Sequence, residues 1–364
     1  MAITRNNQFE PDYAVHPGEI LNETLDARGI RKTDFAERCG ISLKTISQII
    51  NGKAPVTPET ALQFERVLGI SADIWNNLDS RYKLVMARRN KLKELESLEE
   101  WVNTFPIAEL RKRGVISDKR ERTLLADELL KFFGVANPEA WDEFYGNLAA
   151  VFRKSQSFES SAESVAAWLR FAECAAEEID TDVYNDRKFR AALAKIRGFT
   201  TEAPGYFEPK IKEICRESGV IFVVVPSFPK TRLSGATRWL GNNKALIALT
   251  LRYKSDDQFW FSFFHEAGHI LLHGKRRVFI DDRHSDNDTL EREANEFARD
   301  FLMPPGEYRK FIAGGRFYKE DIIDFAKRIS IVPGIVVGLL QHEKVIDYKW
   351  HNDLKKNMNL LRNR

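Results

Sequence analysis

One stretch constrains this chain more than any other: FWFSFFHEAGHILLHG, at residues 259–274. It is among the most apolar runs in the sequence, yet it contains three histidines and a glutamate. Imidazole and carboxylate groups are costly to bury unless another group compensates them. The stretch therefore predicts a buried helix whose polar side chains share a partner, and a divalent cation would be such a partner.

His265 and His269 are four residues apart, so on a helix they lie on one face, one turn apart. Glu266 completes the pattern HExxH, in which the two histidines bind zinc and the glutamate is the general base. The pattern fixes only three positions, and a chance match is the alternative. Chance matches fall mostly on polar helices, whereas this one is flanked by phenylalanine, isoleucine and leucine, which favours the metal site.

A catalytic zinc also requires a third protein ligand. The segment TLEREANEFARDFLMPP, at residues 289–305, supplies a candidate. Its predicted buried face, at helical spacing, consists of Leu290, Ala294, Phe297 and Phe301. Its predicted solvent face consists of Arg292, Glu296, Arg299 and Asp300. Glu293 falls on the predicted buried face, so we expect it to be the third zinc ligand; a structural buried salt bridge is the alternative.

Other polar residues near these motifs have supporting roles in this interpretation. His273 continues the histidine stripe, but three histidines on one straight helix do not converge on one ion, so we expect a structural or supporting role. Asn295 and Glu291 could each orient a ligand histidine, although for Glu291 a solvated helix position is favoured. Tyr308 and Arg238 are the candidates for oxyanion donors.

The regions around this helix predict a small sheet within a mainly helical chain. GVIFVVVPSF (219–228) and KALIALTL (244–251) are apolar runs bounded by turn residues, as is typical of strands. We expect a substrate strand to add to the edge of the second run. The stretch ISIVPGIVVGLLQHEKVI (329–346) predicts one more helix and a short strand.

The first eighty residues predict five short helices, at 19–28, 34–39, 43–50, 59–69 and 72–78. Their predicted core consists of Phe35, Ala36, Ile41, Ile46, Ile49 and Leu62. The layout is that of a helix-turn-helix, with Gly40 at the turn. The alternative is a five-helix protein-interaction module.

In the helix-turn-helix interpretation the third helix enters the major groove. Its predicted outer residues are Leu43, Lys44, Ser47 and Gln48. Gln can contact adenine and Lys can contact guanine. Asn51 and Lys53 follow the helix, where phosphate contacts are usual.

Composition limits the compartment and the classes of partner that we expect for the protein. The chain has 364 residues and a net charge of +3, which is too small to argue for nucleic acid by itself. Three scattered cysteines without a CxxC pattern indicate a reducing compartment and argue against a cysteine zinc site. No apolar signal core or membrane-spanning run is present. We expect a soluble, cytoplasmic protein with no membrane partner.

The strand ALIALTL and the helices FHEAGHILLHG and EREANEFARDFLMP resemble the ImmA/IrrE family of metallo-endopeptidases, over about residues 205–346. The resemblance implies a gluzincin-like α+β core in which His265, His269 and Glu293 bind Zn2+ and Glu266 is the catalytic base. The ligand set also admits Mn2+. Characterised members of that family cleave specific repressor proteins.

The N-terminal stretch resembles the lambda-repressor-like helix-turn-helix of HigA/VapI-type antitoxins, over about residues 10–81. The motifs HPGEIL, NGK and DIWNNL carry the resemblance. It implies binding to double-stranded operator DNA as a homodimer and repression of the protein's own operon. It also implies recognition by residues of the third helix, which are Leu43, Lys44, Thr45, Ser47 and Gln48.

These observations predict four regions. They are a helix-turn-helix domain at 10–82, a helical connecting region at 83–200, a metallopeptidase domain at 201–348 and a basic tail at 349–364. The serine-rich stretch SQSFESSAES (155–164) is the best linker candidate.

The predicted function is a DNA-binding transcriptional regulator of the antitoxin type whose zinc endopeptidase domain cleaves a specific regulatory or toxin protein. The alternative is a non-catalytic repressor that uses the peptidase fold as a sensor or docking domain.

Overall fold

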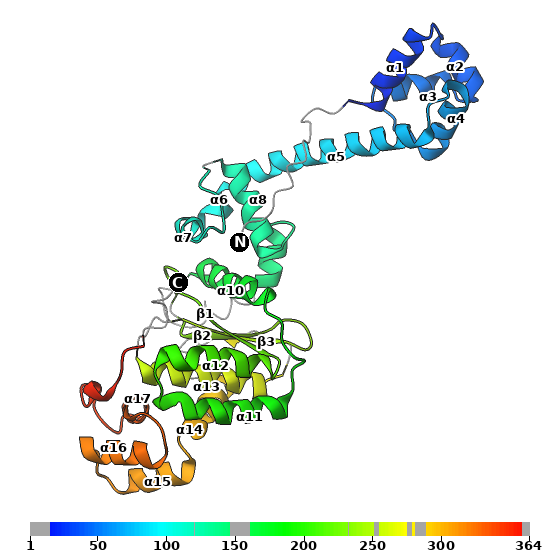
Figure 1. Cartoon of the computed structure of the whole chain (residues 1–364). Helices are drawn as coiled ribbons and strands as arrows, with labels where there is room; N and C mark the ends of the chain where they lie inside the picture. The colour runs from blue at the N-terminus through cyan, green and yellow to red at the C-terminus, as the bar shows by residue number, and fades with distance from the viewer. Residues whose placement is uncertain are drawn as a thin grey trace. The chain divides into compact units, whose positions relative to one another are not determined.

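The computed structural model describes residues 15–119, 121–145, 161–231, 233–250, 255–274, 279–280 and 289–358. These residues are mainly helical with one small sheet, which confirms the predicted fold class (Figure 1). The chain divides into two compact units: residues 1–99 with 121–126, and residues 100–120 with 127–364. Each unit is described below by itself.

The first unit contains the helices predicted for a helix-turn-helix. They are α1 (Pro17–Ala27), α2 (Lys32–Cys39), α3 (Leu43–Ile50), α4 (Pro58–Leu68) and α5 (Ala72–Glu96). Ser42 caps α3 by accepting the backbone N–H of Thr45, and Gly40 ends α2 in the left-handed conformation that glycine adopts readily. Helix α5 has 25 residues and continues through residue 82, where the sequence suggested a domain boundary.

The core of this unit is close to the predicted one. Phe35, Ile46 and Ile49 are fully or almost fully buried, and Ile41 packs at the edge of the same cluster. Leu62, however, is 50% exposed, so its predicted core position is wrong. On α4 the buried stripe consists of Ala61, Phe64 and Leu68, and Leu62 lies off that stripe.

The start of α1 is held tightly against α3. The ring of His16 is buried, and its Nδ1 accepts the N–H of Gly18 at 2.9 Å. A Cβ atom at position 18 would overlap the carbonyl oxygen of Ile49, so only glycine fits there. The HPG sequence therefore fixes how the chain enters the helix-turn-helix.

The second unit begins with short helices. They are α6 (Glu99–Asn103), α7 (Ile107–Lys112), α8 (Arg122–Phe133, whose first turn belongs to the first unit) and α10 (Ala162–Glu177). Most of the predicted serine-rich linker, 155–164, lies outside the described residues; Ser161 caps α10.

A four-stranded sheet with the order β1-β3-β2-β4 forms the centre of the second unit. The strands are β1 (Val220–Val224), β2 (Gly235–Trp239), β3 (Ala245–Leu249) and β4 (Phe279–Ile280). β3 pairs parallel with β1 and antiparallel with β2, and β2 pairs antiparallel with β4. Helix α10 covers one face of the sheet, and α13 (Asp256–Leu272) covers the other (Figure 1).

The two predicted strands are present as β1 and β3, but the expected role of β3 is wrong. Both edges of β3 are paired, and all five of its residues are buried. A substrate strand has no free edge there. A continuous apolar run is typical of a strand covered on both faces, and here it is also central in the sheet.

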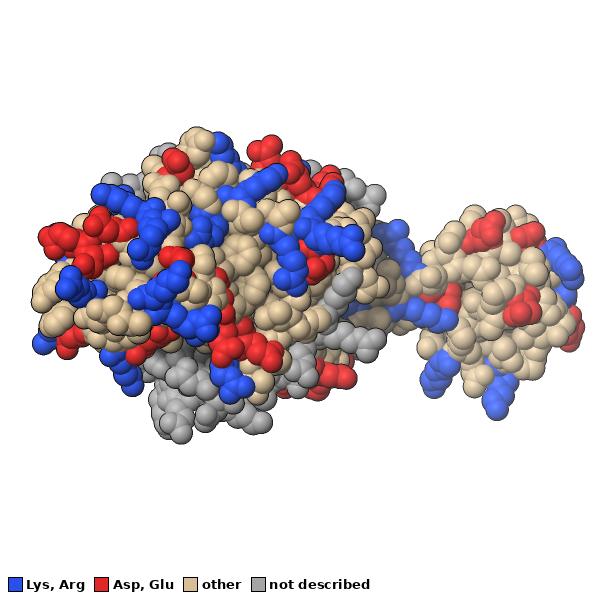
Figure 2. Space-filling view, turned by 90° about the horizontal axis from the view of Figure 1, so that it is seen from below, with Lys and Arg blue, Asp and Glu red and all other residues tan. Residues whose placement is uncertain are grey.

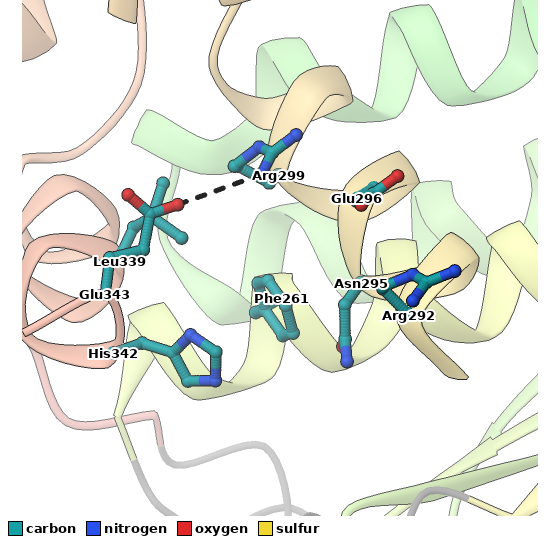
Figure 3. A pocket seen from close by; sticks show the side chains of 8 residues that line it. All are labelled: Phe261, Arg292, Asn295, Glu296, Arg299, Leu339, His342 and Glu343. Atoms are coloured by element: carbon teal, nitrogen blue, oxygen red, sulfur yellow. Dashed lines mark ion pairs between the residues drawn. The ribbon is translucent and has the colours of Figure 1, made fainter. Parts of the chain in front are cut away.

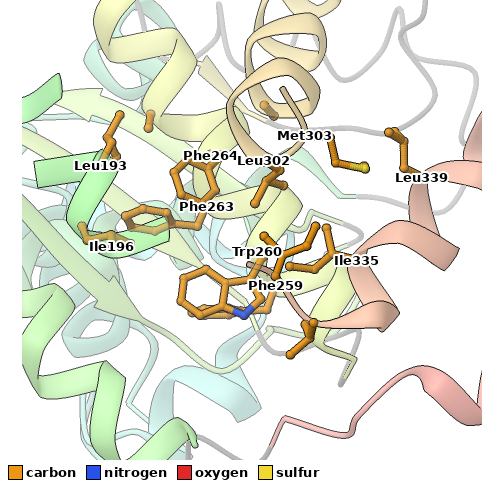
Figure 4. Close-up of a cluster of buried hydrophobic side chains, with 14 of the residues drawn as sticks. Leu193, Ile196, Phe259, Trp260, Phe263, Phe264, Leu302, Met303, Ile335 and Leu339 are labelled. Carbon is orange, nitrogen blue, oxygen red and sulfur yellow. The ribbon is translucent and has the colours of Figure 1, made fainter. Parts of the chain in front are cut away.

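A large apolar core fixes α13 against the sheet and the C-terminal helices (Figure 4). Phe259, Trp260, Phe263 and Phe264 of α13 supply its centre. The helices and turns around this core are α11 (Asp186–Arg197), η1 (Gly198–Thr201), α12 (Pro204–Arg216), α14 (Thr289–Leu302), α15 (Pro305–Ala313), α16 (Lys319–Arg328), α17 (Pro333–His342) and η2 (Asn352–Leu354).

The segment after α17 forms turns, so the short strand predicted near residue 346 is not found among the described residues. The described part of the predicted basic tail packs back onto the second unit. Lys355 forms an ion pair with Asp257 at 2.8 Å and donates to Gln341, while the N–H of Asp256 donates to the carbonyl of Lys356. These contacts tie the tail to the start of α13.

The surface carries both signs of charge. On the visible face of the second unit, Lys and Arg side chains are interspersed with Asp and Glu (Figure 2). The small net charge of +3 is therefore a balance of many charges.

Candidate metal centre and DNA-contacting helix

His265 and His269 lie on the buried face of α13 with their rings directed at each other. Their side chains are 1% and 0% exposed, and the two Nε2 atoms are 3.0 Å apart. Two neutral imidazole nitrogens gain nothing from such an approach unless a proton or a cation lies between them. The apolar helix therefore brings two ligand atoms together at the spacing predicted from the sequence.

The carboxylate that joins them is that of Glu291. Its oxygens lie 3.2 Å from Nε2 of His265 and 3.4 Å from Nε2 of His269, and the side chain is 14% exposed. His265, His269 and Glu291 form a group whose ligand atoms all lie within 4.8 Å of one another. The structure therefore places Glu291 beside the two histidines, where the sequence predicted Glu293, and it contradicts the interpretation of Glu291 as a solvated residue.

Glu293 instead contacts the outer histidine. Its Oε2 lies 3.0 Å from Nε2 of His273, and its side chain is 47% exposed. The buried stripe of α14 consists of Ala294, Ala298 and Leu302, with Phe297 and Phe301 only partly buried.

Glu291 is three residues before Ala294 and seven before Ala298, so it lies on that buried stripe. The sequence-based prediction placed the large aromatic residues at the centre of the buried face of α14, and this rotation turns Glu293, in place of Glu291, toward α13. The small alanines, where α14 approaches α13 closely, carry the correct signal. A Cβ at Gly268 of α13 would lie 3.3 Å from the Cα of Ala294, which shows how close the two helices are.

The spacing of the three ligand atoms fits zinc. With bonds of about 2.0–2.1 Å, tetrahedral ligand atoms lie about 3.3 Å from one another. Here the two Nε2 atoms are 3.0 Å apart, Oε2 of Glu291 lies 3.2 Å from Nε2 of His265, and Oε1 of Glu291 lies 3.4 Å from Nε2 of His269. Two nitrogens and one carboxylate are also a donor set that a catalytic zinc uses.

The ionisation of the group suits a cation. Burial lowers the pKa of His269, which favours the neutral ring. Burial raises the pKa of Glu291, but hydrogen bonds with His265 and His269 outweigh it and lower the pKa to about 2. At neutral pH Glu291 is therefore a carboxylate.

Two neighbours hold the histidine rings. Asn295 Oδ1 lies 2.9 Å from Nδ1 of His265, and His273 Nδ1 lies 2.9 Å from Nδ1 of His269. A proton on Nδ1 of His265 donates to the Asn295 oxygen and leaves the Nε2 lone pair directed at the group. Asn295 and His273 thus occupy the supporting positions that the sequence suggested.

Glu266 is fully buried between α13 and β2. Thr237 Oγ1 donates to its Oε2 at 2.6 Å and also lies 3.0 Å from its backbone oxygen. Glycine at position 235 leaves room for this carboxylate, because a Cβ there would lie 2.7 Å from Oε1 of Glu266. Sequence reasoning missed Thr237 and Gly235, because β2 lacks the apolar pattern of a strand.

The two residues suggested as oxyanion donors are engaged elsewhere. Tyr308 donates from its hydroxyl to Glu343 at 2.6 Å, and Arg238 forms an ion pair with Glu173. Neither contact involves His265, His269 or Glu291.

A cavity of about 320 Å³ lies beside the group (Figure 3). Phe261 and Asn295 line it, and both also contact His265, Phe261 through ring contact at 6.3 Å. Arg299 and Glu343, which form an ion pair at 3.9 Å, line the far part between α14 and α17. The cavity therefore adjoins His265 of the candidate metal centre.

In the first unit, α3 presents the side chains suggested for DNA contact. Leu43, Lys44, Ser47 and Gln48 are exposed, while Ile46 and Ile49 face the core. Thr45 is partly buried, with its hydroxyl 2.8 Å from that of Ser42. Asn51 and Lys53 are exposed just beyond the helix.

Comparison with known proteins identifies both regions. Residues 21–75 match the helix-turn-helix family model, and residues 220–336 match the peptidase M78 model, described as an IrrE N-terminal-like domain. In the described part of the chain no helix is long and apolar enough to span a membrane.

The N-terminal region also matches individual proteins. A stretch of 73 residues is 36% identical to the uncharacterized HTH-type transcriptional regulator YddM of Escherichia coli K12, covering 20% of this chain and 78% of that protein. Another of 79 residues is 35% identical to virulence-associated protein I of Dichelobacter nodosus, covering 21% and 73%. The structure of Pseudomonas aeruginosa antitoxin HigA with its higBA promoter is 30% identical, over 23% of this chain and 94% of that one, with a TM-score of 0.22.

Fold and family models together define a two-domain regulator class, with a helix-turn-helix and a peptidase-type domain in one chain. The chain belongs to the family of helix-turn-helix transcriptional regulators and carries an IrrE N-terminal-like domain.

Proposed function

We propose that this protein is an operator-binding, antitoxin-like autorepressor whose second unit is a zinc-dependent endopeptidase acting on a specific regulatory or toxin protein. The observation that carries the proposal is the group of His265, His269 and Glu291, with the buried carboxylate of Glu266 on the same helix. A purely structural site has no need of a buried, acidic fourth residue beside its ligands.

Zn2+ would be held by His265, His269 and Glu291, with Mn2+ as a substitute that the same donors accept. When bound, the metal would supply Lewis acidity that activates water and polarises a peptide carbonyl. Glu293 has no place in this ligand set, because it contacts His273.

Glu266 would act as the general base. Its carboxylate would take a proton from the attacking water and return it to the leaving amine. The hydrogen bond from Thr237 to Oε2 fixes the carboxylate against β2, so its orientation does not depend on substrate. Asn295 and His273 would keep the ligand rings in place during turnover.

The helix-turn-helix would bind the protein to its operator DNA. Lys44, Ser47 and Gln48 would contact base edges, Leu43 and Thr45 would pack near them, and Asn51 and Lys53 would contact phosphates. A homodimer on a palindromic operator is the arrangement that such domains use. The peptidase activity would then remove a partner whose level controls the same operon.

Substitution of Glu266 by Gln tests the proposal. Gln keeps the shape of the side chain but cannot accept the proton, so proteolysis should fall by about 10²- to 10⁴-fold. Zinc content and operator affinity should stay at the wild-type level. The variant should also retain its uncleaved substrate, so it is the bait of choice for affinity capture from cells of the source organism.

The matched control is Glu293→Gln, an exposed carboxylate near the same site. It should cleave the captured substrate like the wild type. If purified wild-type protein and Glu266→Gln leave every captured partner intact alike, the peptidase proposal is wrong. The second unit would then be a metal-stabilised sensor or docking domain attached to a repressor.

A further inference from the structure

A second cavity, of about 550 Å³, lies in the second unit on the α10 side of the sheet. Its lining comes from the end of α8, residues 134–145, α10 and the end of β2. Helix α13, with the candidate metal centre, packs on the opposite face of the sheet (Figure 1). Cavities of this size are typical of small-molecule sites, and neither family match assigns a ligand to this one.

A buried ionic network lies at the wall of this cavity. Glu173 is only 4% exposed and contacts two arginines: Nη1 of Arg170 at 3.2 Å, and Nη1 of Arg238. Arg170 is held by further bonds, because its Nε donates to the carbonyl of Phe132 and its Nη1 donates to Glu177 as well as to Glu173. These bonds fix Arg170 between α8 and α10.

The guanidinium of Arg238 makes fewer hydrogen bonds to the described residues than that of Arg170. Its side chain is 14% exposed, and only Nη1 donates to a carboxylate of the described residues. Nε and Nη2, which together form the fork that matches a carboxylate, make no such bond within that part of the chain. A largely buried guanidinium at a cavity wall is thus poised for a bidentate anion.

Aromatic rings surround the same guanidinium. The ring centroids of Phe144 and Tyr145 lie 5.1 and 6.0 Å from its central carbon, and Phe133 lines the cavity beside them. Aromatic rings favour a planar apolar body, whereas the arginine fork favours a carboxylate. One ligand that satisfies both has an aromatic ring and a carboxylate.

Strand β2 connects this cavity to the candidate catalytic base. Side chains alternate along a strand, so Thr237 and Arg238 point to opposite faces of the sheet. Thr237 donates to Glu266 on the α13 side, and Arg238 forms its ion pair with Glu173 on the α10 side. A ligand that draws on Arg238 therefore acts on the strand that positions Glu266.

We propose that this cavity binds a small aromatic carboxylate through Arg238 and the rings of Phe144 and Tyr145. Binding changes the contact between β2 and Glu266, which is the hydrogen bond from Thr237. The ligand is an effector and not a substrate, because the sheet separates it from the candidate metal centre. The binding step is independent of the proposed peptidase activity; only the regulatory consequence rests on it.

Calorimetric titration of the full-length protein with 2-naphthoate, and with the neutral 2-naphthamide, tests the binding step. The naphthoate should bind at least about tenfold more tightly than the amide, because only the acid forms charge-assisted bonds with the guanidinium. Arg238→Gln should weaken naphthoate binding by about 10- to 100-fold and leave the amide unchanged.

Two further variants guard against loss of folding. Ala140→Trp fills the cavity without touching the ionic network, and it should abolish binding of both compounds. Arg190→Gln, at an exposed ion pair on α11, should bind like the wild type. The proposal would be overturned if Arg238→Gln and Ala140→Trp bound naphthoate as tightly as the wild type. It would also be overturned if the wild type bound acid and amide equally, or bound naphthoate no more tightly than about 1 mM.

Hydrogen–deuterium exchange tests the coupling without any need for proteolysis. Saturation with 2-naphthoate should change the exchange of residues 235–239 and of the α13 residues around Glu266. Unchanged exchange in both segments, with binding present, would overturn the coupling. Because neither readout uses activity, an inactive peptidase would not affect either result.

Discussion

Glu291 and Glu293 show how strongly two positions on one helix can differ. They are two residues apart on α14, so they point about 200° apart around the helix axis. Glu291 is 14% exposed and faces two buried histidines, whereas Glu293 is 47% exposed and reaches only His273. The same side-chain chemistry therefore gives a candidate metal ligand in one case and a peripheral contact in the other.

The pair provides a matched test of the ligand set. Glu291→Gln should lower zinc affinity by more than about 100-fold, since loss of a direct ligand costs more than loss of a supporting residue. Glu293→Gln should lower it by about tenfold or less. Competition with a chromophoric chelator measures both, and the reverse ranking would return Glu293 to the ligand set.

Asp256 has an unusual environment at the start of α13. It is 3% exposed, its carboxylate faces Gly334 of α17, and burial raises its pKa to about 6. The folded state therefore favours the protonated acid over the carboxylate. The stabilisation from this group is complete below its ordinary value of 3.8 and is lost as the pH rises through 6.

We expect the free energy of unfolding to depend on pH through Asp256. Relative to Asp256→Asn, which cannot ionise, the wild type should lose about 2–4 kcal/mol between pH 4 and pH 7. Urea unfolding of both proteins at each pH measures the difference, in which other titrating groups cancel. A constant difference across this range would show that Asp256 ionises normally in the folded protein.

At the scale of elements, the end of α11 holds two other helices in place. Arg197 is its last residue, and its guanidinium donates to the carbonyls of Phe301, Leu302 and Ile329. These carbonyls lie at the C-terminal ends of α14 and α16, where backbone acceptors lack helical partners and the helix dipole favours a cation. Arg197 therefore anchors the helix that carries Glu291.

Replacement of Arg197 by Met should lower the free energy of unfolding of the second unit by about 2–4 kcal/mol, since several buried carbonyls lose a charged donor. Arg190→Met, on the exposed side of the same helix, should change it by less than about 0.5 kcal/mol. Denaturant titration followed by far-UV circular dichroism compares the two. Equal effects of both substitutions would remove the anchoring role of Arg197.

The sequence predicted the elements with strong apolar signals and missed those without them. The apolar runs correctly predicted α13, β1 and β3, and the capping residues Ser42 and Thr57 correctly predicted the starts of α3 and α4. Strand β2 was not predicted, because its α13-facing positions include Gly235 and Thr237, which are small or polar where they contact Glu266. A strand built around a buried carboxylate does not show the usual apolar alternation.

The candidate site was only partly predictable for a related reason. Both histidines and Glu266 follow from a motif whose spacing alone places them on one helix. The third carboxylate depends on the rotation of α14, and its small residues, Ala294 and Ala298, determine that rotation by close packing. Because Phe297 and Phe301 are the largest apolar residues of this segment, the prediction placed them on the buried face, and that face includes Glu293.

At the scale of the whole molecule, one chain combines a helix-turn-helix with an IrrE N-terminal-like domain. A DNA-binding domain restricts where the protein acts, and a specific peptidase would determine which partner it removes. The two domains lie largely in separate compact units, so variants of one proposed activity should leave the other intact.

Two variants on the first unit test its contacts with DNA. Gln48→Ala should reduce discrimination between operator and altered sequences by about 1–3 kcal/mol per lost base contact. Lys53→Ala should weaken binding to all sequences alike and reduce the salt dependence by about one unit of slope. Fluorescence anisotropy at several salt concentrations measures both effects. No detectable binding of the wild type at low salt would favour a protein-interaction module.

The most direct measurement of the central claim compares protein N-termini in cells of the source organism that carry either the wild type or Glu266→Gln at native level. Glu266 is fully buried, and its substitution by an amide of nearly the same shape removes the negative charge and the proton acceptor. Enrichment of N-terminal peptides should show at least one new internal N-terminus, in a partner protein or in this chain, that is present with the wild type and absent with the variant. Identical sets of N-termini under every growth and stress condition, with both proteins folded, loaded with zinc and bound to their operator, would contradict the account.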